Sequence, residues 1–156
     1  MAFFKITRVT LTLLALLALT SCSIFKPYDK LKVVAAENVN PDGNQRPSPI
    51  QLKIFQLTSR TTVDNMDFDS LFYHADVILS DELLSTTTYM VVPKETIKTK
   101  LKLLPNAHYI AIVAAYRDID QSQWKHIYQV SPHGHYKHII TLGDAEIIVG
   151  NGDTAE

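Results

Sequence analysis

The sequence predicts an all-β domain, an antiparallel β-sandwich with one small helical insertion. Seven or so short stretches alternate apolar and polar residues or are rich in β-branched and aromatic residues, and Pro, Gly, Asn and Asp separate them. Only residues 68–79 repeat apolar side chains with the period of a helix. Parallel βαβ units would need a helix between most successive strands, so the pattern favours a sandwich over an α/β fold.

The chain begins with a segment typical of a signal peptide, residues 1–21. Lys5 and Arg8 precede an unbroken apolar run at 9–19, and small residues follow it. As a helix this run would reach only about 16 Å, against a hydrocarbon core of about 30 Å. A cleaved signal therefore fits better than a spanning helix, and Cys22 becomes the first residue of the mature chain.

Residues 19–22, Leu-Thr-Ser-Cys, resemble the lipobox of bacterial lipoproteins. The resemblance implies that the Cys22 thiol carries diacylglycerol and that the new amino group is acylated, and two or three acyl chains hold a protein at a bilayer almost permanently. The alternative is a buried or disulfide-forming cysteine after an uncleaved anchor, but the chain has no second cysteine. Ser23 stands where the bacterial sorting rule implies that Asp would favour retention in the inner membrane, so we expect the outer membrane, facing the periplasm.

The mature chain has the size and charge of one acidic domain. Removing residues 1–21 leaves 135 of 156 residues, with 13 basic and 16 acidic side chains and a formal charge of −3. This balance disfavours a nucleic-acid binder, for which a clustered basic surface is the usual footprint. No cysteine remains inside the domain, so an apolar core must stabilise it without disulfides.

The first part of the mature chain predicts a tether, a strand and a long loop. Residues 22–30 lack a sustained apolar period and are interpreted as a lipidated tether, and the domain is assigned to 31–149, with its first strand at 31–37. Residues 38–49 contain three prolines, a glycine and several Asn and Asp residues, which block regular structure. A polar connection of about a dozen residues is near the upper end of what compact domains use without a function. Composition alone supports a solvated loop and a functional loop equally.

The next segments predict a strand and the inserted helix. Residues 50–58 alternate with Ile50, Leu52 and Ile54 on the buried face. Asp67 is placed to cap a helix whose apolar stripe we expect to pack against the sheet. That stripe consists of Phe68, Leu71, Phe72, Ala75, Ile78 and Leu79.

The rest of the domain predicts further strands. Lysines alternate along residues 96–103, as on a solvated face or an edge strand. Residues 109–116 are apolar on both faces, which indicates a central strand covered on each side. The other expected strands cover 86–92, 124–130, 136–142 and 146–149, and the polar tail 150–156 is expected to be disordered.

The histidines offer a rival function, a periplasmic sandwich that binds a metal. His133, His135 and His138 lie close together in sequence, and imidazole is a common ligand of transition metals. The alternation of a strand, however, places His135 and His138 on opposite faces. A third alternative is a ligand or peptide bound at a sheet edge. The sequence has no nucleophile elbow, no HExxH helix and no glycine-rich phosphate loop, so we expect neither an enzyme nor a cofactor.

The order of several short motifs resembles the TssJ (SciN-like) outer-membrane lipoproteins of type VI secretion systems. After the signal and lipobox come NPDG at 40–43, RPSP at 46–49 and IQLKIFQL at 50–57. The similarity continues through FYHAD at 72–76, VP at 92–93, the strand at 109–116 with Arg117 and Asp118, and WK at 124–125. The succession of these pieces covers most of the chain.

The resemblance implies a transthyretin-like, or immunoglobulin-like, sandwich with helical additions, anchored in the outer membrane. It also implies that the loop between the first two strands contacts the periplasmic domain of the inner-membrane component TssM. The resemblance therefore favours a functional loop at 38–49 over a solvated loop without a function. The partner-binding residues expected in this loop are Asn40, Pro41, Asp42, Gly43, Asn44, Gln45 and Arg46.

Overall fold

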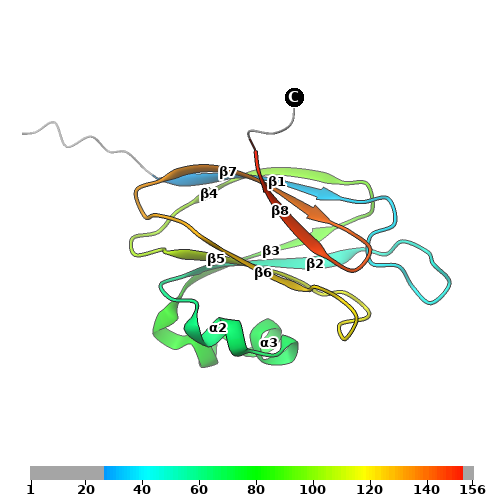
Figure 1. Cartoon of the computed structure of the whole chain (residues 1–156), viewed down its shortest axis with the longest axis horizontal. Coiled ribbons are helices and arrows are strands. Elements are labelled where there is room, and N and C mark those ends of the chain that lie inside the picture. Colours follow the sequence, from blue (N-terminus) through cyan, green and yellow to red (C-terminus); the bar gives the residue numbers. More distant parts are fainter. Residues whose placement is uncertain (1–26, 153–156) are drawn as a thin grey trace, which may run out of the picture.

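The computed structural model describes residues 27–152, and they form two four-stranded sheets stacked face to face (Figure 1). One sheet has the order β4-β1-β7-β8 and the other β3-β2-β5-β6. The strands are β1 Tyr28–Ala35, β2 Ile50–Leu57, β3 Leu83–Val91, β4 Thr96–Lys102, β5 Tyr109–Ala114, β6 Lys125–Gln129, β7 His135–Leu142 and β8 Ile147–Asn151. The predicted β-sandwich with a short helical insertion is confirmed.

One strand pair differs from the antiparallel arrangement that we expected. β1 pairs with β4 antiparallel but with β7 parallel, in the register Tyr28 to His135 through Ala35 to Leu142. Both strands start at the same end of the sandwich, and alternation along a strand does not specify the direction of its neighbour. The other pairs between neighbouring strands are antiparallel.

Both ends of the domain extend beyond the predicted bounds. β1 starts at Tyr28, three residues before the expected strand, so residues 28–30, which were assigned to the tether, belong to a strand. β8 ends at Asn151, so the first two residues of the expected tail belong to a strand. The signal peptide expected at residues 1–21, Cys22, Ser23 and residues 153–156 lie outside the described residues.

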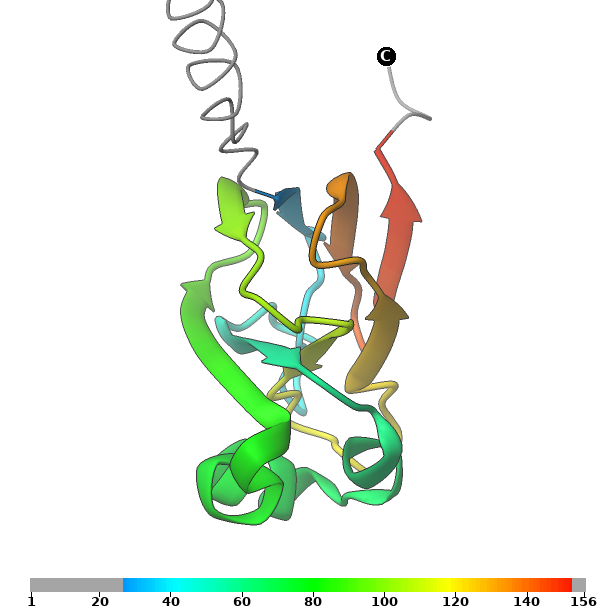
Figure 2. The same ribbon diagram turned by 90° about the vertical axis from the view of Figure 1, so that its left-hand side faces the viewer.

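The apolar side chains form two cores on the two faces of the sheet β3-β2-β5-β6. The first core lies between the sheets and includes Ile50, Leu52 and Ile54, as the alternation predicted. The second core lies between that sheet and the helices, which Figures 1 and 2 show on its outer side. β5 contributes to both cores, so the prediction of a central strand covered on each face is confirmed.

The helical layer consists of α2 (Thr61–Asn65), α3 (Phe68–Leu79) and the 3₁₀ turn η1 (Ser80–Glu82). α3 has the predicted bounds, and the Asp67 side chain accepts a hydrogen bond from the Ser70 amide at its N-terminus. Ile78 does not lie on the buried stripe as predicted, because it is 44% exposed. The dihedrals of His74 (φ −128°, ψ 17°) mark a kink in the helix, but Ala75 and Leu79 beyond it remain buried. α2 was not predicted, since it buries only Val63.

None of the helices within residues 27–152 has the length and apolarity needed to cross a membrane.

A buried polar cluster joins the two sheets near the start of β1. Asp29 is fully buried, and its Oδ2 atom accepts a hydrogen bond from the Tyr128 hydroxyl (3.0 Å) and lies 2.7 Å from Nδ1 of His138. The other oxygen, Oδ1, is buried without a hydrogen-bond partner among the described residues. A buried polar group that is left without a hydrogen-bond partner destabilises the folded protein, so the Tyr128 hydroxyl is important for stability.

We therefore expect Tyr128→Phe to lower the free energy of unfolding by about 1–3 kcal/mol. The matched control is Tyr136→Phe, because the Tyr136 hydroxyl accepts one hydrogen bond, from the Ser131 amide, at an exposed position. Chemical denaturation of both variants checks this expectation. Equal stability losses in the two variants would contradict the special role of the Tyr128 hydroxyl.

Candidate functional site

The loop between β1 and β2 projects from the end of the sandwich opposite to the first residue of β1 (Figure 1). It is a small ordered hairpin without strands. The Ser48 amide donates to the Val39 carbonyl (3.1 Å), and the Asp42 amide donates to the Arg46 carbonyl (2.9 Å). The Gln45 amide closes the tip on the Asp42 carbonyl (2.8 Å). Residues 38–49 therefore form a loop, as predicted, and one with a defined conformation.

The Asp42 carboxylate organises the tip of this hairpin. Its Oδ1 atom accepts hydrogen bonds from the amides of Asn44 (2.9 Å) and Arg46 (3.0 Å), and its Oδ2 atom lies 2.7 Å from the Arg46 guanidinium. The hydrogen bonds from the Arg46 amide and guanidinium lower the pKa of Asp42 below its usual value. The carboxylate thus stays ionised, and the loop keeps its shape at neutral pH.

Asn40 attaches the hairpin to the body of the sandwich. Its amide nitrogen donates to the Pro49 carbonyl (2.9 Å), and its side-chain oxygen accepts from the Arg117 amide (2.8 Å). The residue is buried and has a φ of 48°, a left-handed conformation that Asn tolerates better than most residues. Asn40 was expected to offer hydrogen bonds to a partner, whereas the structure uses its side chain inside the protein.

Gln45 also has a left-handed backbone, with φ 62°. Such a conformation in a non-glycine residue persists when the surrounding structure determines it, and it is common at functional sites. Gly43 and the side chains of Asn44, Gln45 and Arg46 are exposed at this tip, so they remain accessible to a partner.

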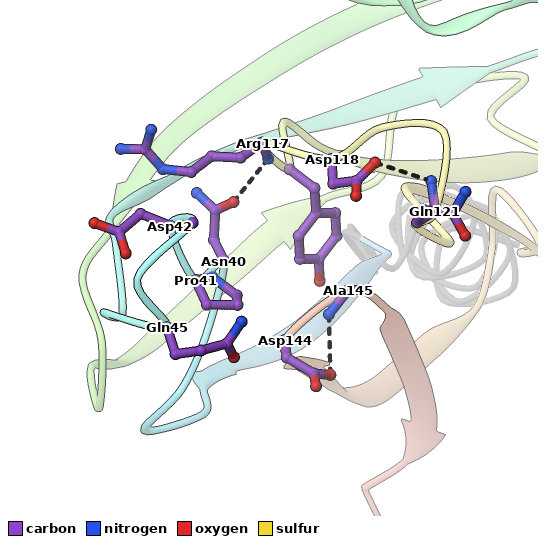
Figure 3. Close-up of a pocket in the computed structure, with 11 residues that line it drawn as sticks. Asn40, Pro41, Asp42, Gln45, Arg117, Asp118, Gln121, Asp144 and Ala145 are labelled. Atoms are coloured by element: carbon purple, nitrogen blue, oxygen red, sulfur yellow. Dashed lines mark hydrogen bonds between the residues drawn. The ribbon is translucent and has the colours of Figure 1, made fainter.

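The loop forms one wall of an open cleft with a volume of about 670 Å³. The other walls come from the connections β5–β6 and β7–β8, which were not expected to join the loop in one site. They supply Arg117, Asp118 and Gln121 on one side and Asp144 and Ala145 on the other (Figure 3).

Tyr116 links the β5–β6 connection to the β7–β8 connection. It is buried, and its hydroxyl donates a 2.6 Å hydrogen bond to the Glu146 carbonyl. Burial raises the pKa of the Tyr116 phenol, so it remains a donor. The turns themselves are closed by carboxylates, since Asp118 accepts from the Gln121 amide and Asp144 from the Ala145 amide (Figure 3).

We expect the conformation of the loop to depend on the ionised Asp42. The pKa of Asp42 is lower in the folded protein than its unfolded value of 3.8. The carboxylate therefore contributes fully to the stability of the loop above the unfolded pKa, and this contribution is lost as the pH falls through the folded pKa. Asp42→Ala should give the same loss at neutral pH. Hydrogen exchange of the Asn44 and Arg46 amides measures it, with Asp69→Ala in α3 as an exposed control; unchanged exchange would contradict the assignment.

The three histidines of the rival hypothesis do not form one site. His133 and His135 are exposed, whereas His138 is buried beside Asp29 in the sheet interior. His135 and His138 face opposite sides of β7, as alternation predicted. Within residues 27–152, no group of three or more His, Cys, Asp or Glu side chains is arranged to hold a metal ion.

The fold and the cleft define a class of protein, a β-sandwich that presents polar loops at one end. The described part of the chain shows no nucleophile, base and oxyanion donors gathered in this cleft. Its polar groups are carboxylates, amides and one guanidinium supported by backbone turns. Such a surface is suited to contact with another macromolecule.

Residues 27–145 match the family of type VI secretion lipoproteins, T6SS-SciN, whose members carry the names VasD, EvfM and TssJ. The chain belongs to this family. The resemblance seen in the sequence is confirmed, and so is the prediction that the protein is not an enzyme, because the family consists of structural lipoproteins. As a lipoprotein of this family, the protein is membrane-bound.

Solved structures share the fold. The lipoprotein TssJ1 from Pseudomonas aeruginosa is 24% identical, with a TM-score of 0.80, and the match covers 83% of this chain and 99% of that chain. Lip from Serratia marcescens, a membrane-bound component of the type VI secretion system, is 22% identical, with a TM-score of 0.73 and coverages of 80% and 97%. A chain in the structure of the TssM C-terminal domain from EAEC is 16% identical, with a TM-score of 0.66 and coverages of 78% and 98%. No functionally curated protein matches the chain in sequence.

Proposed function

We propose that this lipoprotein is anchored in the outer membrane through Cys22, faces the periplasm, and docks the type VI secretion membrane complex by binding the periplasmic domain of TssM. The binding element is the loop 38–49 with the adjoining cleft. The observation that supports this proposal most directly is the ordered hairpin, which Asp42 and Asn40 hold in place next to a polar cleft. A chain with this fold in a solved structure of the type VI membrane complex supports a partner within that complex.

The position of the loop suits a docking element. β1 leads from the tether end to the loop end, and eight residues at about 3.3 Å each separate them by about 26 Å. The loop therefore lies well away from the point where the chain approaches its lipid. A hairpin that is already ordered loses little conformational entropy when a partner binds.

The charges of the cleft indicate what the partner offers. Asp118 and Asp144 are exposed and line the cleft from two sides, with Asp42 in the loop as a third carboxylate. Arg117 is the one basic side chain in this lining. A partner segment with a lysine, an arginine or exposed amides would complement these carboxylates.

The affinity of the mature protein for the TssM periplasmic domain tests the proposal. Asp118→Asn with Asp144→Asn keeps the side-chain oxygens that close the two turns but removes both charges, and we expect about tenfold weaker binding. The matched control is Asp76→Asn, at an exposed position in α3. Absence of binding by the wild-type protein would contradict the choice of partner, and equal affinity of all three proteins would contradict the cleft.

The proposed outer-membrane location gives a separate prediction at Ser23. We expect Ser23→Asp to redirect the lipoprotein to the inner membrane, because the sorting rule reads the residue after the lipidated cysteine. Density-gradient fractionation measures the location, and Ser23→Thr is the control. An unchanged position of the Asp variant would contradict the sorting argument.

A further inference from the structure

Six lysines share one face of the sandwich. They stand on the outer side of the sheet β4-β1-β7-β8, and all are exposed: Lys30, Lys32, Lys98, Lys100, Lys102 and Lys137. The sequence predicted the row on β4 as a solvated edge, and β4 is indeed an edge strand. An edge needs one or two lysines for protection, but this face extends the lysines over three neighbouring strands.

The sheet register places these lysines directly beside one another. Lys30 pairs with Lys100 on one side and with Lys137 on the other, and Lys32 pairs with Lys98. Like charges at paired positions destabilise a sheet. Asp29 is the one acidic residue in β1, β4, β7 and β8, and it points into the core toward Tyr128. Within these strands, no carboxylate therefore offsets the repulsion on the outer face.

The charge is confined to the half of the face nearest the tether. Beyond Lys32, the next outward position on β1 is Val34, and its neighbours are Thr96 and Thr141. Six of the 13 basic residues after Cys22 thus gather in one patch of a chain with a formal charge of −3. Such a concentration creates a local positive potential that attracts an anionic surface.

The patch lies close to the lipid anchor. It begins at Tyr28, six residues after Cys22, and a chain of that length reaches at most about 20 Å. The Tyr28 ring lies under the ammonium group of Lys100, 3.8 Å from the ring centroid. Tyrosine is common where a protein meets the headgroups of a bilayer. Between β1, β4 and β7 the lysine side chains border a shallow groove of about 480 Å³.

We propose that this lysine face binds the phosphate groups of anionic phospholipids in the membrane that holds the lipid of Cys22. The half of this face nearest the start of β1 lies against the bilayer. The helices and the loop 38–49 are then on the periplasmic side. The inference rests on the lipid anchor of the proposed function but not on the choice of TssM as partner. The anchor supplies attachment, and the lysines fix the orientation of the domain.

Amine acetylation of the mature lipoprotein, inserted through its own lipid into vesicles, tests this proposal. We would compare phosphatidylcholine vesicles with and without phosphatidylglycerol and read each lysine by mass spectrometry. We expect Lys30, Lys100 and Lys137 to react about fivefold more slowly when phosphatidylglycerol is present, because each lysine near an anionic surface contributes an interaction of that size. High salt should abolish the difference. Lys94, at the loop end and paired with Glu37, is the internal control and should not change.

A variant separates charge from simple proximity. Lys98→Gln with Lys100→Gln should reduce the protection of Lys30 and Lys137, whereas Lys94→Gln should not, and thermal unfolding verifies that both fold. Equal reaction rates in the two vesicle types would overturn the proposal, and so would protection by peptidoglycan sacculi in place of phosphatidylglycerol. If the protein fails to float with vesicles, the anchor of the proposed function fails instead. If TssM binding is retained without lysine protection, only the present inference fails.

Discussion

Replacing residues 41–46 with a short Gly-Ser linker should abolish most of the affinity for the TssM periplasmic domain and leave the sandwich folded. We expect at least about a 30-fold loss, the effect of removing one interaction hot spot, because the exposed tip of the hairpin and its fixed shape both disappear. The fold should survive, since the apolar cores do not include these residues and loop length contributes little to stability. Asn40 stays in the variant because its side chain supports the Arg117 amide.

Affinity and thermal unfolding have to be measured on the same preparations. Asn40→Ala is the informative comparison, because it should lower stability by about 1–3 kcal/mol through the unpaired Arg117 amide as well as affect binding. The linker variant should lower affinity alone. A linker variant that keeps its melting temperature and its affinity for TssM would contradict the docking role of the loop. It would direct attention to the exposed side of α3, where Val77 is 75% exposed.

Much of the fold could be predicted because buried positions recur with the period of a strand or a helix, and the apolar residues show that period. This pattern predicted β2 and β5, and it predicted α3, whose period and N-terminal Asp67 define its bounds. The parallel pairing of β1 with β7 could not be predicted, because it depends on how the chain returns to the first sheet. The burial of Ile78 was predicted wrongly because Ile78 lies at the edge of the apolar stripe, outside the face formed by Leu71, Phe72, Ala75 and Leu79.

The candidate site was also predicted only in part. Local composition indicated the loop 38–49, since prolines and polar residues exclude regular structure there. The partners of the loop in the cleft come from residues about 75 to 105 positions later, and no local pattern connects Asn40 with Arg117 or with Asp144. The side chain of Asn40 shows the limit of composition most clearly. A polar residue in a loop is expected to face water, and only the three-dimensional arrangement reveals that it bonds inside the protein.

The largest effect on location is expected from Cys22→Ser, which should remove the protein from the outer membrane. Without the thiol no diacylglycerol can be attached, and two or three acyl chains supply nearly all of the attachment of a lipoprotein. The described helices offer no spanning segment as a substitute. The lysine face should hold the unlipidated protein only weakly, so a high-salt wash should release what remains, since salt screens exposed charges. Fractionation of cells that express either form measures the effect, with Ser21→Ala as a control that keeps the cysteine. A Cys22→Ser protein that still sediments with the outer membrane after the salt wash would contradict the lipid anchor, whether or not its signal has been removed.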